Sequence, residues 1–203
     1  IQNGVDVEKY KFIEGTDKQN LKDKLNLPKD KTIIIYSGQI IDRKDQQSAI
    51  EGVIGTERDD ICLLLLGDGA NREKLQEKYK ENKNIIFTGS VTNVAEYLQA
   101  SDLYLSTSKS EGMPNGVLEA MACGLPLLLS DIPQHKEIVE TNEKIGNIYK
   151  IGDRDALVKA IKEILSIDLA EAGKESYNTV MENFTSTSMS KKYQEFYKKL
   201  LNK

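Results

Sequence analysis

The sequence predicts a doubly wound α/β domain, in which helices cover both faces of a parallel sheet. Between residues 32 and 130, short apolar runs alternate with longer amphipathic segments, as in repeated strand and helix units. The apolar runs are continuous, for example at 63–66, which favours strands buried on both faces. With 203 residues and 39% hydrophobic side chains, the chain can bury one sizeable core.

Six strands are expected, each a short apolar run bounded by small or polar residues. They are TIIIYS (32–37), ICLLLLG (61–67), NIIFTG (84–89), DLYLST (102–107), LPLLLS (125–130) and GNIYKI (146–151). Amphipathic segments predict helices at about 45–54, 72–82, 93–100, 115–123, 153–166, 168–182 and 186–201. We therefore expect one domain over residues 1–203, with a core at about 30–166 and C-terminal helices at about 168–201.

Composition argues against several classes of protein. No apolar run approaches the roughly 20 residues of a membrane-spanning helix. The formal charge of -4 gives no general attraction for nucleic acid, and no residues have the spacing of a metal site. Cys62 and Cys123 lie in apolar stretches, which favours buried reduced thiols and a cytoplasmic protein.

Ligands of a doubly wound sheet bind beyond the carboxyl ends of its strands, so the loops that follow strands are the candidate sites. In SGQIIDRKD, Gly38 lets the backbone turn, and Arg43 and Lys44 offer positive charge to a phosphate. The alternative is a solvated turn with two surface cations. In GDGANRE (67–73), the glycines favour a tight connection from strand to helix over contact with a ligand.

The third loop, EGMPNGVLE, divides two carboxylates. Pro114 favours an extended residue before it and a helix after it, which places Glu111 on a loop and Glu119 in the first turns of a helix. The backbone amides of Gly116 and Val117 would then form an anion site for a diphosphate, and Glu119 would accept from a sugar diol. The alternatives are a helix-dipole charge for Glu119 and a solvent-exposed loop position for Glu111.

A resemblance to a known family decides between these alternatives. The stretch EGMPNGVLEAMACGLPLLLSD resembles the motif of two glutamates separated by seven residues in retaining GT-B glycosyltransferases, especially family 4. Further segments resemble that family in the same order along the chain: NGVD (3–6), SGQIIDRKD, NIIFTG, PQHKEIV, IGDRDALVKAIKEIL and FTSTSMSKKYQEFYKKLL. The ordered set carries the resemblance, since any one match is short.

The resemblance implies a Rossmann-like domain, the C-terminal half of a GT-B fold, with a nucleotide-diphosphate sugar as donor substrate and no cofactor or metal. It implies that Lys44 contacts the diphosphate, that Glu119 holds the ribose hydroxyls, and that Glu111 is the catalytic residue beside the transferred sugar. It assigns these residues to the donor site: Gly38, Arg43, Lys44, Glu111, Gly112, Met113, Pro114, Asn115, Gly116, Val117 and Glu119.

The implied function is the donor-binding half of a retaining glycosyltransferase in polysaccharide or glycolipid biosynthesis. Its partners would be an N-terminal acceptor domain absent from this chain and, through that domain, a glycan or lipid-linked acceptor, with no nucleic acid. The enzyme would be cytoplasmic, with any contact to a membrane made by the absent domain. The alternatives are a GT-B sugar epimerase or phosphorylase, and a non-catalytic module that binds a nucleotide sugar.

Two residues stand apart from the family pattern. Gln39 occupies the position where the family commonly carries an arginine, so Arg43 either takes over that contact or points to solvent. His135 is the only histidine, and we expect it at the surface or at a helix start, with no catalytic role.

Overall fold

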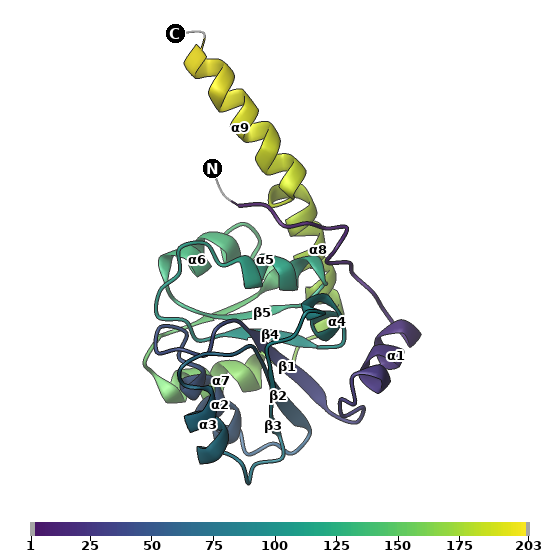
Figure 1. The fold of residues 1–203 in the computed structure, drawn as a ribbon, viewed down its shortest axis with the longest axis vertical. Coiled ribbons are helices and arrows are strands. Elements are labelled where there is room, and N and C mark those ends of the chain that lie inside the picture. The colour runs from purple at the N-terminus through teal and green to yellow at the C-terminus, as the bar shows by residue number, and fades with distance from the viewer. Residues whose placement is uncertain (1–2, 202–203) are drawn as a thin grey trace.

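The computed structural model describes residues 3–201 and confirms a six-stranded, all-parallel sheet between two layers of helices (Figure 1). The strand order is β3-β2-β1-β4-β5-β6, so the chain reverses its direction across the sheet between β1 and β4. Their bounds are β1 Thr32–Ser37, β2 Ile61–Leu66, β3 Ile85–Gly89, β4 Leu103–Ser106, β5 Leu127–Ser130 and β6 Gly146–Tyr149.

Alternating residues of each strand fill two cores. In β1, Ile33 and Ile35 face one core and Ile34 and Tyr36 face the other. The first core is covered by α4 (Val94–Gln99), α5 (Asn115–Ala122), α6 (Pro133–Val139) and α8 (Leu169–Asn183). The second is covered by α2 (Gln46–Gly55), α3 (Arg72–Lys78) and α7 (Arg154–Ile164). Burial on both faces explains why the strands are continuous apolar runs.

Two α-helices were not predicted from the sequence, nor was the short 3-10 helix at Glu143–Ile145. Helix α1 (Thr16–Lys24) lacks a clear apolar stripe because its buried residue is Lys22, whose ammonium group lies 3.0 Å from Asp102. Helix α6 was not among the predicted helices, because its seven residues are too few to show a period. Its signal was Pro133, a residue well suited to a first helical position.

The predicted elements end within a few residues of their expected bounds. The largest difference is at α3, which ends at Lys78 and not at 82. A turn follows, in which the amide of Asn84 donates to the Asn82 side chain at 3.0 Å. Asparagine side chains that bond the nearby backbone favour turns over helix continuation.

Helix α9 (Ser186–Leu201) has no buried residue. It extends away from the sheet and the helices that cover it (Figure 1). Its exposed apolar side chains include Tyr193, Phe196, Tyr197 and Leu200. Within residues 3–201, no helix combines the length and hydrophobicity that crossing a membrane requires. Both cysteines are buried and free, as expected.

Glycines allow the loops after β1 and β2 to touch through their backbones. Gly67 has φ +140°, and a Cβ atom there would lie 2.0 Å from the carbonyl oxygen of Gly38. At Gly69, φ is +157° and a Cβ atom would lie 2.5 Å from the oxygen of Ile40. The glycines of this loop thus allow two loops that follow adjacent strands to approach each other closely.

We expect Gly67→Ala to lower the free energy of unfolding by about 2 to 6 kcal/mol, because backbone strain and overpacking add together. Gly112→Ala is the matched control, since a Cβ atom there meets nothing within 4 Å, and it should change stability by no more than about 0.5 kcal/mol. Urea unfolding of both variants measures the difference. Equal stabilities would show that the two loops separate without cost.

Candidate functional site

A cavity of about 790 Å³ lies where the carboxyl ends of the strands meet the following loops. Residues after β1, β2, β3 and β4 line it, so it spans the point where the strand order reverses. Parallel strands bring the ends of separate βα units to one edge, and the reversal leaves a crevice there. The cavity is therefore in the place where a doubly wound sheet binds its ligand.

Most residues that the sequence assigned to the donor site line this one cavity. They are Gly38, Arg43, Lys44, Glu111, Gly112, Met113, Asn115, Gly116 and Glu119. Pro114 and Val117 do not line it, and both are buried. The amide of Val117 donates to the carbonyl of Pro114 at 2.9 Å, so an anion at the start of α5 would have to share that amide.

Sequence reasoning left out part of the lining. The residues it did not assign to the site are Ser37, Gln39, Leu66, Gly67, Asp68, Gly69, Ser90, Val91 and Val94. Most of them directly follow the ends of β1, β2 and β3. Their positions after strand ends could have indicated them, because the residues after every strand of a parallel sheet reach the same edge.

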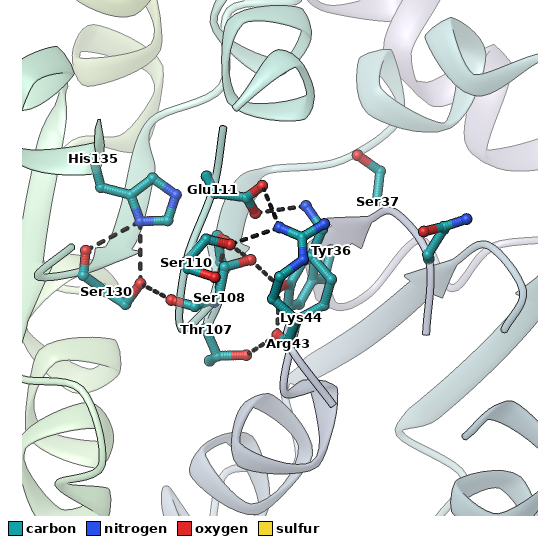
Figure 2. A network of polar contacts seen from close by, with 12 residues as sticks. Tyr36, Ser37, Arg43, Lys44, Thr107, Ser108, Ser110, Glu111, Ser130 and His135 are labelled. Carbon is teal, nitrogen blue, oxygen red and sulfur yellow. Dashed lines mark hydrogen bonds and ion pairs between the residues drawn. The ribbon is translucent and has the colours of Figure 1, made fainter. Parts of the chain in front are cut away.

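Two cations face the carboxylate of Glu111 at one side of the cavity (Figure 2). Lys44 Nζ lies 2.5 Å from Glu111 Oε1, and Arg43 Nη1 lies 3.1 Å from Oε2. The Glu111 side chain is only 6% exposed, so the exposed-loop alternative does not fit it. The solvated-turn alternative fails for Lys44, which is 18% exposed, but Arg43 is 44% exposed and remains partly in solvent. Burial acts to raise the pKa of Glu111, but hydrogen bonds from Lys44, Ser108 and Arg43 outweigh it and hold the pKa below its usual value.

Further hydrogen bonds tie the loop that carries Lys44 to the loop that carries Glu111 (Figure 2). The buried hydroxyl of Tyr36 donates to the Lys44 carbonyl at 2.6 Å and lies 2.8 Å from Ser108 Oγ. Thr107 Oγ1 donates to the Asp45 carbonyl at 2.7 Å. Asp45 itself is left-handed at φ 51°, which reverses the chain between Lys44 and α2. These bonds thus hold the backbone carbonyls of Lys44 and Asp45.

Glu119 occupies a different environment on α5. Burial raises its pKa, while a hydrogen bond from Tyr10 and the charge of Lys9 act in the opposite direction. Close approach of α5 to the sheet requires Gly116, where a Cβ atom would lie 2.6 Å from the Tyr104 hydroxyl. Glu119 therefore faces the cavity without the pair of cations that neutralises Glu111.

His135 is fully buried at the start of α6, which corrects the alternative of a surface position. Its Nδ1 lies 3.1 Å from both the carbonyl oxygen and the hydroxyl oxygen of Ser130 (Figure 2). That hydroxyl donates its proton to the Ser108 carbonyl at 2.6 Å. Nδ1 must therefore carry the ring proton, because a carbonyl oxygen can only accept. The histidine supports the strand ends beneath the Glu111 loop.

Burial lowers the pKa of His135 to about 4, against the opposing effects of Ser130 and the Glu111 charge, while the Lys44 charge adds to the lowering. Between an unfolded pKa of about 6.5 and the folded value, only the unfolded chain takes up a proton, so stability falls as pH falls. We expect the wild type to lose about 2 kcal/mol more than His135→Asn between pH 7 and pH 4.5. The variant keeps an N–H group but does not titrate.

Urea unfolding of both proteins at the two pH values measures this difference. Equal losses would mean that the pKa of His135 is the same in the folded protein and in the unfolded chain. Carboxylates that titrate over the same range contribute equally to the loss of stability in both proteins, so their contribution cancels when the two losses are compared.

The cavity combines groups suited to a polar, negatively charged ligand. Arg43 and Lys44 provide ion-pairing donors, α5 begins at its wall, and Glu119 is an acceptor. Among residues 3–201, no group of three or more His, Cys, Asp or Glu side chains is placed to hold a metal ion.

Comparison with known proteins gives a family match over most of the chain. The family model described as Glycosyl transferases group 1 matches residues 17–182. The putative glycosyltransferase EpsD of Bacillus subtilis (strain 168) is 28% identical over 166 residues, which cover 79% of this chain and 43% of that relative. The chain spans about half the length of the curated relatives it matches.

Solved structures share the fold. The C-terminal domain of LpcC, a glycosyl transferase group 1 family protein from Francisella tularensis, has a TM-score of 0.77 at 22% identity and covers 90% of this chain and 99% of that one. Anabaena HepE in complex with UDP has a TM-score of 0.86 at 18% identity, over 97% of this chain and 56% of that one. At these identities, the likeness concerns the fold alone.

Proposed function

This chain belongs to the glycosyl transferases group 1 family, and we propose that it is the donor-binding half of a retaining glycosyltransferase that uses a nucleotide-diphosphate sugar. The observation that carries the proposal is the convergence of Lys44, Arg43 and Glu119 on one cavity beside the start of α5. The UDP named in the HepE structure makes a uridine nucleotide the first ligand to test.

In the proposed complex, Lys44 and Arg43 turn from Glu111 to the diphosphate, with the start of α5 as a further anion contact. Arg43 takes the place of the arginine that Gln39 replaces. Glu119 accepts from the two ribose hydroxyls through its two carboxylate oxygens. Glu111 is then released from its two cations and lies beside the transferred sugar.

Fixed positive charge gives the proposed site its chemical role. When the bond from the sugar to the diphosphate breaks, negative charge grows on the departing phosphate oxygen. Donors already placed near that oxygen stabilise the transition state without having to reorganise. Lys44, held by the contacts of its loop, suits this task. Retention at the anomeric carbon and membership of family 4 belong to the same proposal.

The proposed whole enzyme has an N-terminal acceptor domain outside this chain and a glycan or lipid-linked acceptor, in polysaccharide or glycolipid biosynthesis. Two observations support a further domain. Relatives such as EpsD are about twice as long as the matched region, and helix α9 presents exposed Tyr193, Phe196, Tyr197 and Leu200 beyond the domain body (Figure 1). The two free, buried cysteines fit the proposed cytoplasmic setting, with any membrane contact made by the absent domain.

The different environments of the two acids predict different effects on a bare nucleoside diphosphate. Glu119→Ala should weaken binding by roughly 30-fold to 1000-fold, because it removes two hydrogen bonds to a charged group. Glu111→Ala should leave the affinity unchanged or raise it, because it frees Lys44 and Arg43 for the phosphates. Calorimetry with uridine, guanosine and adenosine diphosphates measures both effects.

Folding of both variants is checked by their thermal unfolding without nucleotide. In the full-length enzyme, Glu111→Ala should mainly reduce turnover, measured with and without an acceptor. Equal losses of affinity in the two folded variants would contradict the division of roles. Absence of binding to all three diphosphates by the wild type would contradict the proposed function itself.

Lys44→Ala should lower the affinity for a nucleoside diphosphate by roughly 10-fold to 150-fold more than it lowers the affinity for the corresponding nucleoside. The reason is that the substitution removes one charge-assisted contact to the phosphates. Lys109→Ala is the matched control. Lys109 is on the adjoining loop and pairs with Asp45 at 3.1 Å, but it does not line the cavity. Calorimetry measures both affinities. If Lys44→Ala lowers the affinities for the nucleoside and for the diphosphate equally, Lys44 does not contact the phosphates.

A further inference from the structure

The N-terminal segment, residues 3–12, reaches the wall of the cavity through one side chain. Asn3 Nδ2 donates to Asn115 Oδ1 at 2.9 Å, although the two residues are 112 positions apart in the sequence. Asn115 is the first residue of α5 and lines the cavity, whereas Asn3 does not line it. A segment far from the glutamate motif thus contacts a residue of the proposed donor site.

The backbone next to Asn3 is held by the junction between α8 and α9, which the segment passes (Figure 1). The amide of Val5 donates to the Phe184 carbonyl at 2.8 Å, and the Ser186 amide donates to the Val5 carbonyl at 3.0 Å. At Gly4, a Cβ atom would lie 2.4 Å from a carbonyl oxygen of this junction. Asn3 therefore approaches α5 from a backbone that is fixed two residues away.

The other end of the segment is held by α4 and α8. Gln99 Nε2 donates to the Lys11 carbonyl at 2.8 Å, and the Phe12 ring lies 5.4 Å from the Tyr177 ring, measured between centroids. The segment is thus attached on both sides of α5. This attachment keeps Asn3 in register with the first residue of that helix.

The hydrogen bond from Asn3 selects one orientation of the Asn115 side-chain amide. Such an amide has an acceptor oxygen and a nitrogen with two donor hydrogens, so its two orientations offer opposite partial charges to a ligand. Asn3 engages Asn115 Oδ1, and no residue within 3–201 accepts from Asn115 Nδ2. A diphosphate presents only acceptor oxygens at neutral pH, so it binds the orientation in which the nitrogen remains available.

We propose that Asn3 is a positioning residue that turns the side-chain amide of Asn115 toward the diphosphate of the nucleotide sugar. The inference rests on the proposed function, in which the diphosphate lies at the start of α5. An amide oriented before the ligand arrives does not have to be ordered on binding, which raises affinity. The N-terminal segment thereby takes part in recognition of the phosphates without touching them.

A double-mutant cycle of Asn3→Ala and Asn115→Ala tests this role. The probes are the nucleoside diphosphate that binds most tightly among those of uridine, guanosine and adenosine, and the corresponding nucleoside. By calorimetry, Asn115→Ala should lower the affinity for the diphosphate by roughly 10-fold to 150-fold more than that for the nucleoside, the effect of one hydrogen bond to a charged group. Asn3→Ala should lower it by roughly 2-fold to 10-fold, the effect of one neutral hydrogen bond.

The effect of Asn3→Ala should vanish when Asn115 is already alanine, because no amide is then left to orient. Glu8→Ala is the matched control. Glu8 belongs to the same segment and pairs with Lys11 at 3.4 Å, but it does not line the cavity, so both affinities should stay unchanged. Thermal unfolding without nucleotide checks that each variant is folded.

Three results would overturn the proposal. The first is an Asn3→Ala effect of the same size with and without the Asn115 amide, which would indicate a general structural role for the segment. The second is an equal loss of nucleoside and diphosphate affinity in Asn3→Ala or in Asn115→Ala. The third is no loss in either variant. A wild type that binds no nucleoside diphosphate would instead count against the proposed function.

Discussion

The ion pairs of Glu111 are the contact on which the site depends. A carboxylate that is 6% exposed stays charged only when cations and hydrogen-bond donors replace the water it has lost. Lys44 and Arg43 supply the cations, and both come from the loop after β1, whereas Glu111 comes from the loop after β4. The burial of one acid thus joins two loops across the centre of the sheet.

Hydrogen bonds hold the backbone of the Lys44 loop, whereas the Lys44 side chain remains free to rotate. Tyr36 and Thr107 bond the main chain near Lys44, which holds the loop while the long lysine side chain can change its partner. A phosphate that attracts Lys44 competes directly with Glu111. In the proposed function, arrival of the diphosphate and release of Glu111 are therefore one exchange of ion pairs, whose balance depends on how well the ligand replaces the lost contacts.

The two acids differ because their neighbours differ. Glu111 faces two cations, whereas burial has the largest effect on the pKa of Glu119, with Tyr10 and the charge of Lys9 acting against it. Their pKa values accordingly move in opposite directions from the ordinary value, down for Glu111 and up for Glu119. A carboxylate with few charged neighbours is suited to neutral hydroxyl groups, and one beside cations responds to the arrival of an anion.

The sequence by itself determined the sheet, the two-sided burial and the loops that form the site, because these follow from local apolar periodicity, from proline and glycine positions and from the rule that strand ends share one edge. Through an ordered family resemblance it also assigned Lys44, Glu111 and Glu119 to one candidate site, and all three line the same cavity. Helices α1 and α6 were missed because a buried lysine and a short length hide their periodicity. Only the tertiary structure decided that Glu111 pairs with Arg43 and Lys44 and that His135 is buried on Ser130. Each of these contacts joins residues whose approach depends on how whole elements pack, and no local pattern in the chain encodes that packing.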